Sequence, residues 1–172
     1  LELSSAASDV YKRQIMGYTS PDKKFYHTDA FTDYAIDRLD EYKDEDKPFV
    51  LYLPYTAPHY PLHAWPEDIA KYRGKYKIGW DKIREQRFKR MNEMGIIGPN
   101  HKLTPRASKA WDDLTDEQKD AEDLKMAVYA AMIDRVDQNL GRLFAKVKKL
   151  GEWENTLIMF LTDNGACPEQ PN

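Results

Sequence analysis

Two apolar runs constrain the fold of this chain more than any other feature of its sequence. Residues 49–53 (FVLYL) and 157–161 (LIMFL) are continuously apolar rather than alternating, and each run stops at a turn. Continuous runs of this length are typical of strands that are buried on both faces of a parallel sheet. We therefore predict strands at residues 49–55 and 156–162.

A long helical pattern lies between the two predicted strands. Thr115 and Gln118 have the spacing of a capping box, which marks a helix start, and Gly151 is well placed to end the helix. Two strands that flank one helix, at residues 116–150, predict a parallel crossover unit, which is right-handed in about 98% of cases. The predicted fold class is α/β, with a mostly parallel sheet that is flanked by helices and incomplete at both ends. Apolar residues recur along the helix at steps of three and four and would lie on the sheet: Tyr129, Ile133, Val136, Leu140, Leu143, Val147 and Leu150.

Shorter helices are predicted on either side of the first strand. Residues 29–45 carry apolar side chains at helical spacing, with Thr28 or Asp29 as the N-cap. Two or three short helices fit residues 67–110, with an interruption near Gly95.

Composition and charge exclude several classes of protein. The hydrophobic content of 41% is enough for a core, and a net charge of −3 gives no global attraction to nucleic acid or to an anionic membrane. No apolar run approaches the roughly 20 residues of a membrane-spanning helix. We expect a soluble protein, whose compartment and oligomeric state the sequence leaves open. Residues 1–14 are expected to be a non-native or disordered leader, and residues 15–172 a partial domain with a cut at each end.

Asp163 and Asn164 are candidate metal ligands. They follow the second apolar run directly and are followed by Gly165. Adjacent carboxylate and amide oxygens suit a hard cation such as Ca²⁺ or Mg²⁺. Asn-Gly is also a common turn dipeptide, so the position at the end of a predicted strand is what favours a functional interpretation.

His59 is the candidate catalytic residue. It lies between Pro58 and Pro61, in residues 56–67, whose prolines predict an extended loop. A fixed imidazole at the edge of a sheet could donate a proton to a leaving alkoxide. A zinc site with His63 would need a helix between the two imidazoles, which Pro61 disfavours.

Three further residues are not expected to take part in chemistry. Cys167 has no His or acid placed to activate it, so we expect a small thiol without a catalytic role. His27 and His101 lack a partner pattern and are expected at the surface.

Charge is uneven along the chain. Residues 71–90 hold nine Lys or Arg, and residues 112–123 hold seven Asp or Glu. The basic segment is either an anion-attracting surface or a solvated segment that complements the acidic one, and the second interpretation is favoured.

Four segments in order resemble the sulfatase family of the alkaline phosphatase superfamily, in particular bacterial arylsulfatases. They are residues 31–39, 56–59 (TAPH), 128–141 (VYAAMIDRVDQNLG) and 161–165 (LTDNG). The resemblance covers roughly residues 25–167, so that residues 15–172 would be part of a sulfatase catalytic domain.

The resemblance implies specific roles for the candidate residues. Asp163 and Asn164 would be two ligands of an active-site Ca²⁺, and His59 would hydrogen-bond the ester oxygen that leaves. The nucleophile of such enzymes is a formylglycine made within a Cys/Ser-x-Pro-x-Arg motif, which this sequence does not contain. The expected parent enzyme hydrolyses sulfate esters of small molecules or carbohydrates, with the nucleophile outside this chain, and the 172 residues alone are expected to be inactive.

Two other functions stay open. A phosphonate monoester or phosphodiester hydrolase of the same superfamily would share the metal-binding turn. A non-catalytic α/β module could instead bind a polyanion through residues 71–90, in which case binding would weaken steeply with salt.

Overall fold

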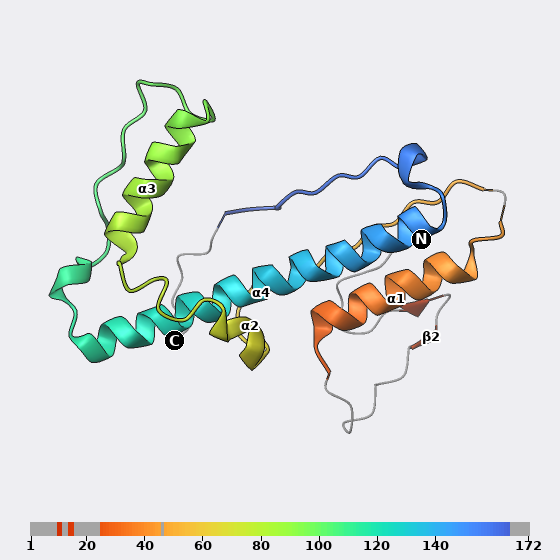
Figure 1. Cartoon of the computed structure of the whole chain (residues 1–172), viewed down its shortest axis with the longest axis horizontal. Helices are drawn as coiled ribbons and strands as arrows, with labels where there is room; N and C mark the ends of the chain where they lie inside the picture. The colour runs from red at the N-terminus through yellow and green to blue at the C-terminus, as the bar shows by residue number, and fades with distance from the viewer. Residues whose placement is uncertain (1–9, 12–13, 16–24, 46, 166–172) are drawn as a thin grey trace.

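The computed structural model describes residues 10–11, 14–15, 25–45 and 47–165, and most of the regular structure in them is helical (Figure 1). Two strands of two residues pair antiparallel near the N-terminus. A long helix, α4, is accompanied by α1 and α2, and α3 stands apart near the N-terminal end of α4 (Figure 1). The elements in chain order are β1 Val10–Tyr11, β2 Gln14–Ile15, α1 His27–Glu41, α2 Pro66–Ala70, α3 Trp80–Glu93, the 3₁₀ turn η1 Trp111–Asp113, α4 Asp116–Lys149 and the 3₁₀ turn η2 Trp153–Asn155.

Both ends of α4 are set by local sequence, as predicted. The Thr115 side chain accepts a hydrogen bond from the Gln118 backbone N–H, and the Gln118 side chain accepts one from the Thr115 backbone N–H, which completes a capping box. At the other end Gly151 has φ +80° and donates to the Lys148 carbonyl, and Glu152 donates to the Val147 carbonyl. These two bonds form a Schellman motif, which requires the left-handed backbone that glycine supplies.

The main apolar core lies between α1 and α4. Ala35 and Leu39 of α1 are buried against Leu143 and Val147 of α4. Partly buried apolar side chains extend this cluster, among them Leu51 and Leu53, Leu150 and Trp153. Burial of apolar surface between two helices is what stabilises this pair.

The prediction of an α/β fold with a mostly parallel sheet is wrong for the described residues. Residues 49–55 are extended but form no strand, apart from a single bridge residue at Tyr52, and residues 156–162 form none. In the first segment Leu51 and Leu53 pack on the helices while the residues between and before them face solvent. In the second segment Leu157 is 82% exposed and Phe160 76% exposed.

The two apolar runs form no sheet because other elements cover the apolar face of α4. Val136, Leu143 and Val147 are buried as predicted, but α1 and α2 cover α4 where a sheet was expected. Ile133, which was expected on the same stripe, is 46% exposed. A strand obtains its backbone hydrogen bonds from neighbouring strands, and residues 25–45 and 47–165 contain none that pairs with either apolar run.

The helix predicted at residues 29–45 forms as α1, but it begins and ends earlier. Tyr26 is its N-cap residue and provides no side-chain cap, so the prediction of Thr28 or Asp29 as the cap was wrong. Both residues instead lie in the first turn, where Thr28 is buried. The short helices predicted within residues 67–110 are confirmed as α2 and α3, although α2 begins one residue earlier, at Pro66.

The base of α3 packs on η1 through two tryptophans. The rings of Trp80 and Trp111 meet edge to face with centroids 4.9 Å apart. The Asp81 carboxylate accepts a hydrogen bond from the Trp111 backbone N–H, and this bond, with that from Arg106, lowers the pKa of Asp81. Gly79 precedes the helix with φ +88°, and its missing side chain leaves room for the Trp111 ring.

Candidate active-site residues

His59 is exposed and lies in a loop, as the sequence predicted, but residues 57–60 form a turn and the loop ends where α2 begins, at Pro66. Its Nδ1 lies 2.6 Å from the Tyr60 carbonyl oxygen. A carbonyl can only accept, so Nδ1 carries a hydrogen and donates it. The other ring nitrogen, Nε2, is then the position at which the imidazole can take up or release a proton. The His59 backbone N–H also donates to the Thr56 carbonyl, at 2.9 Å.

The loop that carries His59 is tied to α1 on both sides. Before His59, the Tyr55 hydroxyl is 2.7 Å from Thr32 Oγ1. After it, the Tyr26 hydroxyl donates to the His63 carbonyl at 2.9 Å. Farther on, the Trp65 indole N–H donates to an Asp29 carboxylate oxygen at 3.2 Å. These contacts fix where the loop starts and ends, and therefore restrict the positions that His59 can reach.

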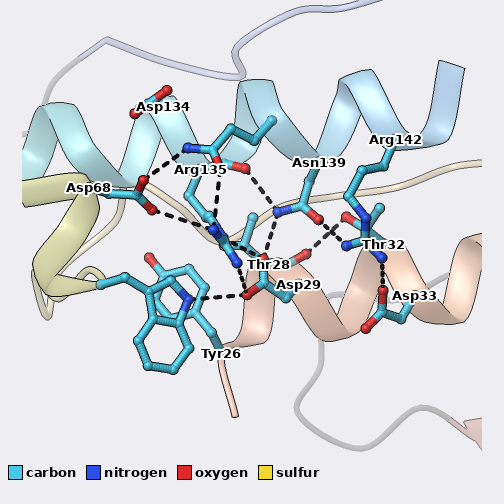
Figure 2. Close-up of polar contacts among 12 residues, drawn as sticks. Tyr26, Thr28, Asp29, Thr32, Asp33, Asp68, Asp134, Arg135, Asn139 and Arg142 are labelled. Carbon is cyan, nitrogen blue, oxygen red and sulfur yellow. Dashed lines mark hydrogen bonds and ion pairs between the residues drawn. The ribbon is translucent and has the colours of Figure 1, made fainter. Parts of the chain in front are cut away.

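Asp29 is the centre of a polar network that joins α1 to α4 (Figure 2). Arg135 donates to its two oxygens at 2.7 and 2.8 Å, and Asn139 donates to one of them at 2.7 Å. Burial by itself would raise the pKa of Asp29, but the hydrogen bonds from Arg135, Asn139 and Trp65 outweigh it and hold the pKa below its usual range. Asp29 is therefore a fixed anion at neutral pH.

Asp68 in α2 extends the same network (Figure 2). Its side chain is 2% exposed, and Oδ1 accepts hydrogen bonds from Lys71 at 2.7 Å and from Gln138 at 3.0 Å. Oδ2 is 3.6 Å from Arg135 Nη1. Burial would raise the pKa of Asp68, yet the hydrogen bonds from Lys71 and Gln138, together with the nearby positive charges, lower it. Asp68 thus holds α2 against α4.

Sequence reasoning missed this network. Its donors in α4 are Arg135, Gln138 and Asn139, whose spacing places them on one face of the helix. That spacing was a usable signal, but nothing local identified Asp29 and Asp68 as the acceptors, because they lie far away along the chain.

Asp163 and Asn164 lie in an exposed turn at the end of the second extended segment. The Thr162 hydroxyl donates to the Asn164 carbonyl at 2.7 Å. Within the part of the chain that the structure describes, no hydrogen bond or ion pair joins either residue to His59, and no group of three or more His, Cys, Asp or Glu could hold a metal ion. Cys167 lies outside the described residues.

Three of the four cations in the first half of the basic segment are neutralised within the chain. Lys71 pairs with Asp68 and Asp134, and Arg73 pairs with Asp120 and Asp123. Lys77 pairs with Asp120 as well. For Arg73 and Lys77 the partner is the acidic segment, as the favoured interpretation of the sequence held, whereas the partners of Lys71 lie outside that segment.

Comparison with known proteins places the chain in a family. The sequence model of the Sulfatase family matches residues 3–171. An uncharacterized sulfatase of Schizosaccharomyces pombe is 40% identical over 147 residues, which cover 84% of this chain and 26% of that protein. The arylsulfatase of Klebsiella aerogenes is 41% identical over 130 residues, 73% of this chain and 27% of that protein. The multifunctional alkaline phosphatase superfamily protein PehA of Trinickia caryophylli is 29% identical over 152 residues, 83% of this chain and 28% of that protein.

The chain spans about a quarter of the length of these relatives. Among its described helices, none has a stretch both long and apolar enough to cross a lipid bilayer. The match of the family model over nearly the whole sequence is nevertheless decisive, and the chain belongs to the sulfatase family of the alkaline phosphatase superfamily.

Proposed function

We propose that this chain is part of a sulfuric ester hydrolase that cleaves aryl or carbohydrate sulfate esters, with His59 as the residue that protonates the leaving oxygen. The observation that supports the proposal most directly is the 41% identity to the arylsulfatase of Klebsiella aerogenes. The matched 130 residues make up 73% of this chain. The formylglycine nucleophile would come from outside these 172 residues, because they contain no Cys/Ser-x-Pro-x-Arg motif.

The geometry of His59 supports a role as a general acid. Its Nδ1 donates to the Tyr60 carbonyl, so that only Nε2 is left to face a substrate. A protonated Nε2 could donate to the ester oxygen as the bond to sulfur breaks, and such proton transfer typically contributes 10²–10⁴-fold to a rate. Contacts on both sides of the loop, from Tyr26 and Thr32, would keep the imidazole in place.

Asp163 and Asn164 would be two ligands of a Ca²⁺ ion. Their oxygens fit a hard cation in kind, but two donors do not complete the roughly 6 to 8 oxygens of a Ca²⁺ site. Among the described residues, no group of three or more His, Cys, Asp or Glu is placed to complete such a site. When bound, a cation there would draw charge from the sulfate oxygens. The 172-residue chain by itself is therefore expected to bind Ca²⁺ weakly and to leave aryl sulfates intact.

The test is the complete enzyme encoded by the gene that contains this sequence. We expect it to hydrolyse 4-nitrophenyl sulfate, and we expect His59→Ala to lower kcat by about 10²-fold or more. The loss in kcat should be larger for a substrate that releases an alkyl alcohol than for one that releases 4-nitrophenol, because a poor leaving group depends more on protonation. His63→Ala, four residues along the same loop, is the matched control and should show no such dependence.

The alternative substrate class is distinguished by the same assay. The similarity to PehA, at 29% identity, is the observation that keeps a multifunctional hydrolase open. Preference for a phosphonate monoester or a phosphodiester over 4-nitrophenyl sulfate would reject the sulfatase proposal. Hydrolysis of 4-nitrophenyl sulfate by the isolated 172-residue chain would reject the proposal that the nucleophile lies outside it.

A further inference from the structure

The second half of the basic segment behaves differently from the first. In α3, the side chains of Arg84 and Arg87 line a cavity of about 320 Å³ between the helix and the chain that returns beside it. His101 and Lys102 on the returning chain line the same cavity, so that it holds three permanent positive charges and one imidazole. Its lining contains no Asp or Glu.

The rest of the lining is mainly apolar. Phe88 and Met91 contribute from α3, and Ile97 and Leu103 from the returning chain. The cavity therefore combines cationic groups with an apolar surface, and its volume lies at the lower end of the range of small-molecule sites. None of these residues belongs to the His59 loop or to the turn at Asp163.

The returning chain is held close to α3 by specific contacts (Figure 1). Gly95, with φ +68°, follows the end of the helix, and the Ile96 backbone N–H donates to the Met91 carbonyl at 3.0 Å. Arg84 donates to both the carbonyl and the hydroxyl of Thr104, at 2.5 and 2.7 Å. Two sides of the cavity are thus fixed before any ligand arrives, which lowers the entropic cost of binding.

Two of the cations are available for a ligand. Arg87 and Lys102 have no side-chain hydrogen bond or ion pair with any residue in the described ranges. His101 donates from Nδ1 to the Gly98 carbonyl at 3.0 Å, so its Nε2 is the ring nitrogen that is left for a ligand. Arg84, Lys71, Arg73 and Lys77 all have partners inside the chain.

We propose that the cavity between α3 and residues 97–104 binds a small organic anion, whose sulfate, sulfonate or carboxylate group contacts Arg87 and Lys102 and whose aromatic or aliphatic body packs on the apolar lining. A polyanion such as nucleic acid fits less well, because only two unpaired cations of the described chain converge here and four of the seven other lining residues are apolar. The site goes beyond the proposed hydrolase activity and does not depend on it.

The probe is naphthalene-2-sulfonate, which carries a sulfonate on a bicyclic aromatic body and has no sulfate ester to hydrolyse. Isothermal titration of the 172-residue chain should show saturable binding that weakens as salt rises. Inorganic sulfate, which lacks the apolar body, and 2-naphthol, which lacks the charge, should each bind at least about fivefold more weakly. Equal affinity for either of these two would overturn the proposal, as would the absence of saturable binding.

Variants locate the binding. Arg87→Gln and Lys102→Gln should each weaken naphthalene-2-sulfonate binding by about threefold to fivefold, the upper range for a partly exposed ion pair. Arg90→Gln is the matched control, because Arg90 lies three residues farther along α3, carries the same charge and does not line the cavity. Arg87 and Lys102 hold nothing in place within the described chain, so both variants should fold, which far-UV circular dichroism checks. An equal effect of Arg90→Gln and Arg87→Gln would show only general charge attraction and would overturn the site.

Discussion

Arg135 in α4 donates two parallel hydrogen bonds to Asp29 in the first turn of α1, from Nε to Oδ1 at 2.7 Å and from Nη2 to Oδ2 at 2.8 Å (Figure 2). The two residues are 106 positions apart in the sequence. The same carboxylate accepts a hydrogen bond from Trp65, which ends the loop that carries His59. One ion pair therefore links the long helix, the first helix and the candidate catalytic loop.

Arg135→Ala should destabilise the chain strongly. It leaves Asp29 partly buried with only neutral donors, and breaking such a pair costs about 2–4 kcal/mol of unfolding free energy. Arg135→Lys keeps the charge but loses the paired geometry, so we expect an intermediate loss. Urea unfolding followed by circular dichroism measures both. Lys125→Ala, which breaks an exposed pair with Glu122 on the same helix, is the control and should change the midpoint little. Equal losses for Arg135→Ala and Lys125→Ala would show that the network adds no stability.

Stability should fall in acid because Asp29 and Asp68 have lowered pKa values in the folded chain. A carboxyl whose folded pKa is depressed contributes stability above its unfolded pKa of about 3.9 and loses it as the pH falls through the folded pKa. The contribution of these two carboxylates to the free energy of unfolding should therefore be constant between pH 7 and about pH 5. It should decrease as the pH falls below about 4.

Asp29→Asn provides the control for that pH dependence. It should be less stable than the native chain at neutral pH, and the difference should shrink as the pH falls below about 4, because the native carboxyl becomes protonated too. Urea titrations at several pH values give the two curves. A difference that stays constant down to about pH 3 would mean that Asp29 is not a source of the acid sensitivity.

Asp123 should be the acidic residue whose loss most disturbs the turn after α2. Its side chain is fully buried and accepts hydrogen bonds from Arg73 and from the backbone N–H groups of Gly74 and Tyr76. Asp123→Ala leaves the two backbone N–H groups without an acceptor and leaves Arg73 with Asp120 alone, at a cost of about 3 kcal/mol. Asp123→Asn should be nearly as harmful, because an amide NH₂ cannot accept where a carboxylate oxygen did.

Asp120→Ala is the matched control for Asp123. Asp120 also pairs with Arg73, but its side chain is half exposed. Its loss should lower the urea midpoint clearly less than the loss of Asp123. If the two alanine variants unfold at the same midpoint, the backbone contacts of Asp123 contribute nothing.

Gly79→Ala should cost more than Gly74→Ala although both glycines have positive φ, +88° and +82°. A methyl group at Gly79 would lie 2.3 Å from the Trp111 ring, whereas nothing lies within 4 Å of one at Gly74. Both variants carry backbone strain of about 1–3 kcal/mol, and only Gly79→Ala also displaces Trp111. Near-UV circular dichroism should show a change in the tryptophan signal for Gly79→Ala alone. Identical spectra and midpoints for the two variants would contradict the close packing.

Features that depend on neighbouring residues could be predicted from the amino-acid sequence. The capping box at Thr115 and the glycine at Gly151 bound α4 because each supplies its hydrogen bonds within a few residues. The break near Gly95 and the surface loop around His59 follow in the same way from glycine and proline. The order of short motifs was also enough to recognise the sulfatase family, which the family match confirms.

The long-range partners of each segment could not be predicted in this way, because they depend on how the chain folds. The run at residues 157–161 reads as a buried strand, but a strand exists only where another strand supplies hydrogen bonds, and the described chain supplies none there. In the sequence, nothing distinguishes Asp29 and Asp68 from other acidic residues. Their role follows from the fold, which places Arg135 beside both of them. Likewise, Arg73 and Lys77 of the basic segment are neutralised because the fold places Asp120 and Asp123 beside them, whereas Arg84 and Arg87 line a cavity. Local patterns specify helix ends and turns, whereas the use of a charge or an apolar face depends on what the fold places opposite it.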